Sequence, residues 1–411
     1  MSESSTYHLF GAYGIELEYM IVDASTFDVL PVADRVLEAA AGVLTDEIDK
    51  GEITWSNELV LHVLELKVSH PALRLPGLAA VFQRSVGEVN QILSGFGGRL
   101  MSAAAHPWMN PERESRLWPH AYSEIYREFD RIFGCRTHGW TNLQSMHINL
   151  PFADDIEFAR LHAAVRFLMP ILPALAASSP YLDARFTGLL DARLEAYHNN
   201  ARKIPSIAGS VIPEPVYSQS AYEQEILERL YHDTAPHDTR GILRYEWLNA
   251  RGAIARFDRN TIELRVLDSQ ECPLADLAIA WAVDHVLKAL ASERWTSLQD
   301  QQRWEVDPLR RILLDTIRDA EATLIMNTDY LRSLGYSASD RCTTGDLWKH
   351  LMESVIPEDP EFSPVLRQIL KHGPLGRRLL NAVGMNAQRG DLIETWGRLC
   401  DCLAQGRLFV G

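Results

Sequence analysis

Cysteine is scarce in this sequence, and the few cysteines form no pattern. There are five in 411 residues, an odd number scattered along the chain: Cys135, Cys272, Cys342, Cys400 and Cys402. Only Cys400 and Cys402 are close together, but two such positions on a helix point about 200° apart, so we do not expect them to bind one metal ion. The start, "MSESSTYHLF", lacks the basic and apolar regions of a signal peptide. These absences predict a cytoplasmic protein with reduced thiols.

Positive charge and long apolar runs are also lacking. Lys and Arg number 40 against 55 Asp and Glu, which gives a formal net charge of −15. This balance argues against a nucleic-acid or anionic-membrane partner, because both attract basic surfaces. No apolar run reaches about 18 residues without a charge or a proline, so we expect no membrane-spanning segment.

What is present is an ordinary globular composition, with 46% hydrophobic and 23% charged residues, enough for a large core. Strand-like alternation and helical periodicity are interspersed over the first 292 residues. The expected strands are 10–23, 58–68, 99–105, 145–150 and 261–268. The expected helices are 31–44, 75–93, 114–133, 155–175 and 273–292.

After residue 295 the strand signal ends, and helices are expected at 307–326, 344–356, 363–373 and 391–405. The sequence therefore predicts an α+β fold with a mixed domain over 1–295 and a helical C-terminal portion over 296–411 packed on it. Residues 198–220, "HNNARKIPSIAGSVIPEPVYSQS", are rich in proline and show little periodicity, so we expect a long loop inside the first domain.

Three of the expected strands carry two polar residues, two positions apart, opposite an apolar face. The pairs are Glu16 and Glu18, His147 and Asn149, and Glu263 and Arg265. Because side chains alternate along a strand, each pair points to one side. Two carboxylates about 6 Å apart repel by roughly 3 kcal/mol at an effective dielectric of about 20. A cation is therefore expected between Glu16 and Glu18.

If these strands share a sheet, Glu16, Glu18, His147 and Glu263 gather around one point, with Arg265 beside them. Carboxylates with an imidazole and without thiolates suit Mg²⁺ or Mn²⁺, which prefer oxygen ligands. The alternation alone leaves an alternative open, in which these strands simply have a solvated outer face.

A further acidic region is "NELVLHVLELKV", which holds Glu58 and Glu65. The two glutamates lie an odd number of positions apart, so on one flat strand they would face opposite ways. Both join the site only if a bend or bulge lies between them. Glu65 also shares its face with Lys67, and a plain ion pair between these two is the alternative.

The motifs "GIELEYMIVD", "SAAAHPWMNP", "MHINLP", "SSPYLDARFTGLLDAR" and "TIELRVLDSQECPLAD" together resemble the type 2 glutamate-cysteine ligase family, also called carboxylate-amine ligases. Their order and rough spacing match from about residue 9 to 292. The resemblance implies a glutamine-synthetase-like fold, in which an antiparallel sheet curves into a funnel flanked by helices. It also implies ATP-dependent ligation, in which a carboxylate is phosphorylated and the acyl phosphate is attacked by an amine.

The resemblance also implies roles for particular residues. Glu16, Glu18, His147 and Glu263 would hold the Mg²⁺ ions that bridge the ATP phosphates, with Glu58 and Glu65 as further ligands. Arg265 would face the transferred phosphoryl group and act in catalysis with Glu263, and Asn149 would lie with Arg265 at the nucleotide. Phosphoryl transfer needs mainly positioning and neutralisation of charge, which metals and a fixed guanidinium supply.

Arginines in the family's substrate segment correspond to Arg185 and Arg193, which the resemblance assigns to the carboxylates of the acid substrate. A guanidinium pairs with a carboxylate in bidentate fashion; without the resemblance, each would be interpreted as a surface ion pair. His106 in "AHPW" also lies in a family motif and is placed with the substrate residues, with an ordinary packed His-Pro turn as the alternative.

Two departures from the family pattern bear on substrate choice. Many members carry His-x-His followed by glycine where this chain has His147, Asn149 and Pro151; other branches have Asn at the second place, so metal binding is expected to survive. Many members also have serine where Asp191 precedes Ala192 and Arg193. An acidic residue there is expected to alter the accepted substrate, which puts cysteine as the amine in question.

The leading hypothesis is an ATP-dependent carboxylate-amine ligase that forms a γ-glutamyl-type amide from glutamate and an amino-acid amine such as cysteine. A metal-dependent amide hydrolase and a non-catalytic binding protein on the same fold are the alternatives. The expected cofactors are ATP and Mg²⁺ or Mn²⁺, the expected partners are a glutamate-like acid and an amine, and a homodimer is the commonest oligomeric state for such a chain.

Overall fold

The centre of the molecule is one antiparallel sheet, seen in a computed structural model that describes residues 6–411. Residues 1–5, on which the expectation of no signal peptide partly rests, lie outside the described residues. The sheet has eight strands in the order β2-β3-β4-β1-β6-β10-β9, with β5 paired to β1. These strands are β1 (Gly14–Asp23), β2 (Glu47–Asp49), β3 (Ile53–Asn57), β4 (Val63–Val68), β5 (Gly98–Met101), β6 (Ser145–Pro151), β9 (Ala253–Arg256) and β10 (Thr261–Asp268).

The register of this sheet brings the polar pairs of the sequence side by side. Glu18 lies opposite Glu65 of β4, and Glu16 lies between Lys67 of β4 and His147 of β6. On the next strand, Glu263 pairs with Asn149. The prediction that these strands share a sheet is confirmed, and the polar residues share one of its faces.

A bulge in β10 redirects the end of that strand. The pairing of β10 with β6 shifts between Leu264 and Leu267, so that Leu267 faces Met146 and Asp268 faces Ser145. Without the extra residue, Asp268 would point to the apolar face; with it, this carboxylate joins the polar face. The adjacent apolar residues Val266 and Leu267 are the sequence signature of this break in alternation.

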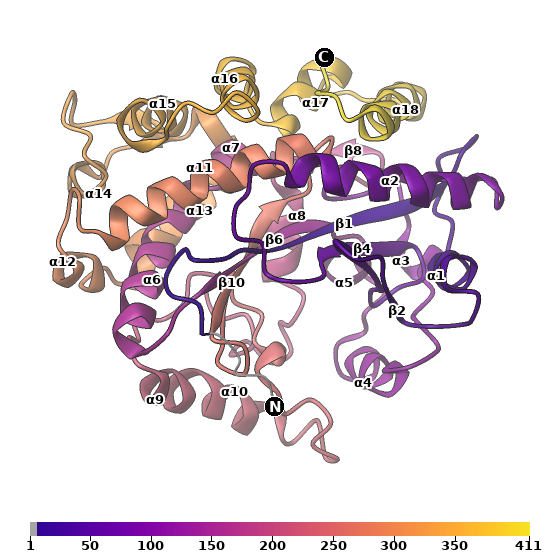
Figure 1. Ribbon diagram of the computed structural model, residues 1–411, viewed down its shortest axis with the longest axis horizontal. Coiled ribbons are helices and arrows are strands. Elements are labelled where there is room, and N and C mark those ends of the chain that lie inside the picture. The colour runs from indigo at the N-terminus through magenta and orange to yellow at the C-terminus, as the bar shows by residue number, and fades with distance from the viewer. Residues whose placement is uncertain (1–5) are drawn as a thin grey trace.

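The other face of the sheet is apolar and covered by helices. Leu17, Leu66 and Ile148 are almost fully buried in a core shared with α2 (Leu78–Ser94), α6 (Asp155–Leu168) and α11 (Pro273–Ala291). In Figure 1, α2 and α11 cross above the strands, whereas α4 (Ser123–Phe133), α9 (Gln219–Tyr222) and α10 (Glu228–Thr234) lie on the opposite side, near the N-terminus. This arrangement leaves the polar face turned away from α2 and α11. The remaining helices before residue 296 are α1 (Ala33–Ala41), α3 (Pro111–Glu114), α5 (His138–Thr141), α7 (Pro173–Ala176) and α8 (Ala192–His198).

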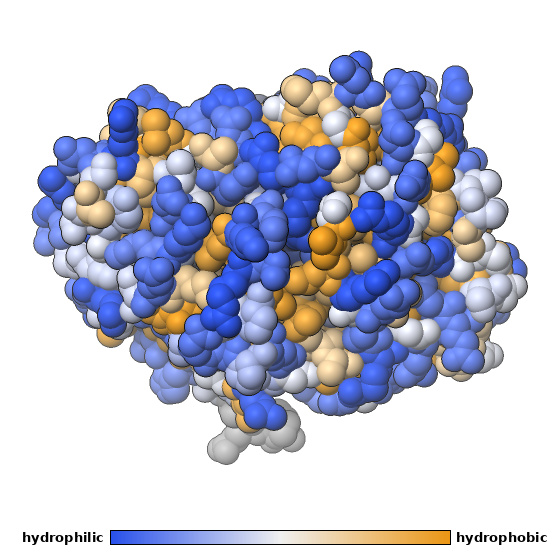
Figure 2. All heavy atoms as spheres, turned by 90° about the horizontal axis from the view of Figure 1, so that it is seen from above, coloured by the Kyte–Doolittle hydropathy of each residue, from blue (hydrophilic) through white to orange (hydrophobic). Residues whose placement is uncertain are grey.

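The C-terminal helices are α12 (Leu298–Gln302), α13 (Val306–Asp319), α14 (Thr328–Ser333), α15 (Thr344–Val355), α16 (Ser363–His372), α17 (Leu375–Val383) and α18 (Arg389–Gln405). In Figure 1, α15, α16, α17 and α18 form an outer layer above α2 and α11, whereas α12, α13 and α14 lie lower, at the left of the view. Leu313, Leu347 and Ile369 belong to the same core cluster as the sheet. The C-terminal portion therefore packs on the rest of the chain, while the boundary at residue 295 stays a prediction. Seen from above, this layer presents apolar patches among hydrophilic side chains (Figure 2).

Several expected elements differ from the structure. The strand predicted over 58–68 begins only at Val63, because the chain turns between β3 and β4. Residues 115–122 of the predicted helix 114–133 are not helical, and β2, β3, β9 and α17 were not predicted. Two-residue strands β11 (Leu324–Ile325) and β12 (Cys342–Thr343) pair within the C-terminal portion.

The long loop predicted over 198–220 is confirmed between α8 and α9, but it is packed rather than open. Ile204, Ile207 and Ile212 are almost fully buried in the main core. None of the helices formed by residues 6–411 has the length and apolarity required to cross a bilayer.

Candidate active site

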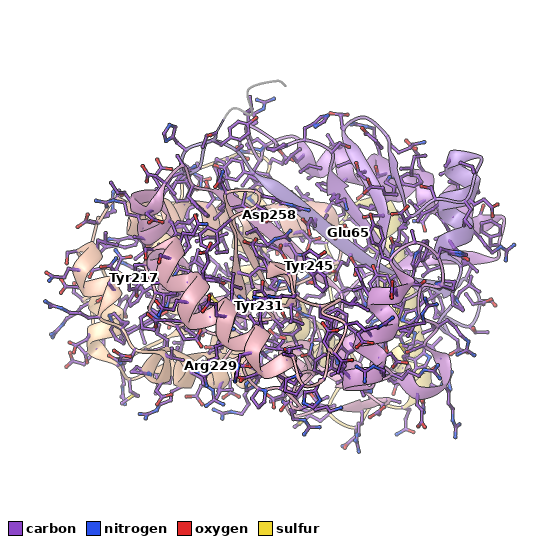
Figure 3. All side chains as sticks on the ribbon, turned by 90° about the horizontal axis from the view of Figure 1, so that it is seen from below. Glu65, Tyr217, Arg229, Tyr231, Tyr245 and Asp258 are labelled. Carbon is purple, nitrogen blue, oxygen red and sulfur yellow. The ribbon has the colours of Figure 1, made fainter. Side chains whose placement is uncertain are left out.

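The polar face of the sheet forms the floor of a cavity of about 850 Å³. Side chains from β1, β4, β6 and β10 line it, and the turn between β9 and β10 closes one side. Viewed from below, the labelled Glu65 on β4 and Asp258 in that turn mark this side of the molecule (Figure 3). The cavity is therefore where the predicted polar residues converge.

One group of potential metal ligands spans three neighbouring strands. Glu16, Glu65 and His147 each offer a ligand atom, and these atoms lie within 4.8 Å of one another. His147 Nδ1 lies 3.0 Å from Glu16 Oε2, and Asn149 Nδ2 donates to Glu16 Oε1 at 3.0 Å. The register of β1 and β6 produces both contacts.

A second group consists of carboxylates alone. Glu18, Glu58 and Glu65 also offer ligand atoms within 4.8 Å of one another. The bend required to bring Glu58 to Glu65 is present, because Glu58 follows β3 in the turn that leads to β4. Glu65 also makes the ion pair that was its alternative, with Lys67 Nζ 3.1 Å from Glu65 Oε1. Sharing Glu65, the two groups form one continuous acidic cluster.

The protonation of this cluster reflects crowding of like charges. Burial and the charge of Glu16 raise the pKa of Glu65 to about 7, and burial with the charges of Glu65 and Glu18 raises the pKa of Glu58 well above its ordinary value. Burial alone would lower the pKa of His147, but the hydrogen bond to Glu16 and the nearby carboxylates raise it to about 9. Crowding of the carboxylates thus favours the protonated forms of Glu58, Glu65 and His147, even with Lys67 beside Glu65.

These residues fit a divalent metal ion of the hard class. The donor set is carboxylate oxygens with one imidazole, and the five cysteines of the chain lie buried elsewhere as free thiols. Mg²⁺ and Mn²⁺ prefer such ligands, and a cation would relieve the repulsion that raises the pKa values of Glu58 and Glu65.

Arginines lie on the β10 side of the acidic cluster. Arg265 Nε donates to Glu263 Oε1 at 3.1 Å, and Arg265 Nη1 donates to Tyr197 Oη at 3.4 Å. Arg256 Nη1 on β9 lies 3.7 Å from Glu263 Oε2. Glu263 therefore sits between two guanidinium groups that line the cavity, and this side can accept anionic oxygen atoms.

Arg193 lines the cavity but is not free. Its Nε donates to Asp268, and both side chains are almost fully buried. The bulge in β10 supplies this carboxylate, which also accepts hydrogen bonds from Ser178 N and Ser179 Oγ, both at 2.8 Å. Arg193 is thereby held rigidly against the floor of the cavity.

The close approach of Asn149 explains why the first motif begins with a glycine, Gly14. A Cβ atom at this position would lie 2.8 Å from Cβ of Asn149, its partner on β6. Only glycine leaves Asn149 room to keep its hydrogen bond to Glu16.

Three residues of the substrate segments lie outside the cavity, in contrast to their expected roles. Arg185 on β8 (Arg185–Phe186), which pairs with β7 (Tyr181–Leu182), is 78% exposed and pairs loosely with Asp183 at 3.8 Å. His106 is buried, with its Nε2 2.8 Å from the carbonyl oxygen of Phe27, so it forms the packed His-Pro turn that was the alternative. Asp191 is buried and caps α8 by accepting from Leu194 N at 2.9 Å, and it does not line the cavity.

Several residues that line the cavity were not predicted from the sequence. They are Arg256, Arg259, Tyr126, Phe129, Trp140, Ser145 and Tyr197. Arg256 was detectable, because "FDRN" is a turn signal immediately before the strand 261–268 and implies a hairpin partner. The aromatic residues carried no such signal, since their helical spacing is equally typical of a core face.

Comparison with known proteins agrees with this architecture. The family described as glutamate-cysteine ligase family 2 (GCS2) matches residues 12–400. An uncharacterized protein of Archaeoglobus fulgidus is 28% identical over 397 residues, which cover 97% of this chain and 100% of that protein. A glutamate–cysteine ligase of Halobacterium salinarum is 25% identical over 323 residues, which cover 74% of this chain and 76% of that protein.

A solved structure shows the same fold. The glutamate–cysteine ligase of Francisella tularensis in complex with AMP superposes with a TM-score of 0.60 and 11% identity, covering 95% of this chain and 88% of that one. The fold is therefore of the glutamine-synthetase-like type, with an antiparallel sheet flanked by helices and a helical C-terminal region. With a family match over nearly its whole length, this chain belongs to glutamate-cysteine ligase family 2 and is an enzyme of the ligase class.

Proposed function

We propose that this protein joins a carboxylic acid to an amine in an ATP-dependent reaction, with a glutamate-like amino acid as the acid substrate. The observation that carries the proposal is the meeting, in one cavity, of an acidic cluster able to hold Mg²⁺ with arginines on its β10 side. Metal-bridged phosphates and guanidinium groups are what a phosphoryl transfer requires.

The acidic residues and the arginines of the cavity have different roles in this proposal. Glu16, Glu65 and His147 would hold one metal ion, and Glu18 and Glu58 with the shared Glu65 would hold another. Glu263 lies beside the first group, 3.8 Å from His147 Nδ1, and Asn149 orients Glu16. A bound metal ion neutralises phosphate charge and orients the phosphates. Arg265 and Arg256 bind the oxygens of the transferred phosphoryl group, and Arg193 binds a carboxylate of the acid while Asp268 fixes its Nε.

The reaction balances in two steps. A carboxylate oxygen of the acid attacks the γ-phosphorus of ATP, the bond from this phosphorus to the β,γ-bridging oxygen breaks, and ADP leaves with that electron pair. The amine nitrogen then attacks the acyl carbon, and the carbon–oxygen bond to phosphate breaks. Phosphate leaves with the electrons and the amine loses a proton, so one ATP is spent for each amide formed.

Trapping the acyl phosphate tests the proposal directly. The protein is incubated with ATP, Mg²⁺, glutamate and hydroxylamine, and the expected product is a hydroxamate formed in equal amount with ADP. Omission of the acid should abolish ADP release. An amide hydrolase would cleave amides without ATP, so hydrolysis that is independent of nucleotide, with no hydroxamate from glutamate or other amino-acid carboxylates, would refute the proposal.

A further inference from the structure

One wall of the cavity is aromatic, and the phosphoryl transfer described above assigns no role to it. Tyr126 and Phe129 from α4 and Trp140 from α5 line the same cavity as the acidic cluster, next to Leu59 and Leu143. All five are only partly buried in the protein. Apolar surface left open inside a cavity is stabilised when an apolar part of a ligand covers it.

This aromatic wall, defined as Tyr126, Phe129 and Trp140, is built rigidly. The ring centroids of Phe129 and Trp140 lie 5.3 Å apart, and Phe133 stacks on Trp140 from outside the cavity at 5.4 Å. Trp140 Nε1 donates to the carbonyl oxygen of Asn200 at 3.0 Å, which satisfies its polar atom away from any ligand. The wall therefore offers ring carbons and few polar groups.

The aromatic wall lies on the carboxylate side of the cavity. Asn57 Nδ2 donates to Tyr126 Oη at 3.1 Å and to the carbonyl oxygen of Glu58 at 3.0 Å. The opposite side, at the turn between β9 and β10, carries Arg256 and Arg259. The guanidinium groups favour the transferred phosphoryl group on their side, which leaves the aromatic rings on the other side for an apolar part of the second substrate.

We propose that the aromatic wall is the specificity pocket for the amine acceptor, and that the preferred acceptor is an amino acid or amine with a flat, apolar side chain. The inference rests on the proposed function and names the substrate class of its second step. The short thiol side chain of cysteine would leave most of the wall uncovered, so cysteine is a poor acceptor.

Matched acceptors test the preference. With ATP, Mg²⁺ and the acid substrate fixed, kcat/KM is measured for L-phenylalanine, L-alanine and L-cysteine, and for 2-phenylethylamine against ethylamine. We expect the aromatic member of each set to be favoured by about tenfold or more, the discrimination that an apolar pocket supplies. Cysteine or alanine equal to or better than phenylalanine would overturn the inference.

Two substitutions on one helix provide a matched control. Phe129→Leu alters the wall, whereas Phe133→Leu alters the same aromatic cluster outside the cavity. We expect the KM for the aromatic acceptor to rise about tenfold in the first variant only, with the KM for ATP unchanged in both. Calorimetric titration of 2-phenylethylamine into protein with Mg²⁺ and a non-hydrolysable ATP analogue should show the same loss without turnover.

The outcomes separate this inference from the proposed function. If Phe129→Leu raises the KM for ATP instead, the wall binds the adenine ring and the inference is wrong. An equal effect of Phe133→Leu would show that the cluster acts only through packing, which also overturns it. Hydroxamate formation without any aromatic preference would sink this inference alone, whereas the absence of both hydroxamate and amide products would remove the proposed function with it.

Discussion

The two faces of the central sheet use the same backbone for opposite purposes. Along β1, Leu17 is fully buried in the core shared with α2 and α11, while its neighbour Glu18 lies opposite the like charge of Glu65 on β4. The apolar face stabilises the fold, because each buried side chain is removed from water. The polar face costs stability, since it holds carboxylates whose pKa values are raised by burial and by one another. Alternate residues of one strand thus have different roles: one set stabilises the fold, and the other set lines the candidate active site.

The largest effect is expected on the apolar face. Leu17→Ala should lower the free energy of unfolding by about 2 to 5 kcal/mol, because it removes buried methyl groups and leaves a cavity. Activity per folded molecule should stay close to that of the wild type. Urea denaturation with kinetics on the same preparation measures both, and a variant that is stable but slow would contradict the division between the two faces.

A large effect on rate with little effect on folding is expected from Arg265→Lys. If Arg265 stabilises charge in the transition state, kcat should fall by about 10² to 10³ while ATP binding stays nearly intact, because lysine keeps the charge but loses the rigid fork. If Arg265 only neutralises Glu263, the variant would be less stable and nearly as fast. Measuring kcat and the melting temperature together separates the two roles.

Glu18→Gln tests whether the polar face acts in metal binding rather than in folding. The substitution keeps shape and an acceptor for Ser145 N, which bonds Glu18 Oε2 at 2.7 Å, but it removes one charge from the cluster. We expect turnover and Mg²⁺ affinity to fall together by at least about 100-fold, since loss of a direct ligand should exceed loss of an outer partner. The metal-free protein should be as stable as the wild type or more so. Unchanged Mg²⁺ dependence would remove Glu18 from the site.

The stability of the metal-free protein should decline as the pH rises. Folding raises the pKa of His147 to about 9, so its contribution is complete below about pH 6.5 and is lost toward pH 9. Folding raises the pKa of Glu65 to about 7, so this carboxyl also favours the folded state at low pH and loses that effect as pH rises through 7. Together we expect a loss on the order of 1 to 3 kcal/mol between pH 6 and pH 9.

Mg²⁺ should cancel this decline, because it replaces the protons of the acidic cluster. Melting temperatures at pH 6 and pH 9, with EDTA or with Mg²⁺, should show the larger metal effect at pH 9. His147→Gln serves as a control and should flatten the upper part of the metal-free profile. A metal-free protein that becomes more stable toward pH 9 would contradict the assignment of these protons.

The smallest effect is expected from Arg185→Ala, which lies on neither face of the sheet. Because this side chain is largely exposed and outside the cavity, stability should change by less than about 0.5 kcal/mol, with no change in the KM for the acid. Arg193→Ala should raise that KM far more than the KM for ATP. An equal rise of the KM for the acid in both variants would show that Arg185 and Arg193 both bind the acid substrate, as the sequence motif predicts.

Much of the fold followed from local patterns. Alternation placed the strands at 145–150 and 261–268 correctly and found β1, although the predicted strand begins at residue 10 rather than at Gly14. Periodicity of 3.6 residues placed α1, α2 and α11 within a few residues, whereas the helix predicted over 155–175 is divided into α6 and α7. The short strands β2, β3 and β9 were missed because they hold only three to five residues, too few for alternation to stand out.

By itself, the sequence determined which residues share a face, because side-chain direction along a strand has a period of two and needs no tertiary information. That was enough to group Glu16 with Glu18, His147 with Asn149, and Glu263 with Arg265. Only the tertiary structure decided which strands are neighbours, since pairing joins segments that are distant in the chain. It brought Glu58 to Glu65 through the turn after β3, and it turned Asp268 toward Arg193 through the bulge in β10. It also left Arg185 outside the cavity while Arg193 lines it, because position in the cavity depends on packing that no short motif encodes.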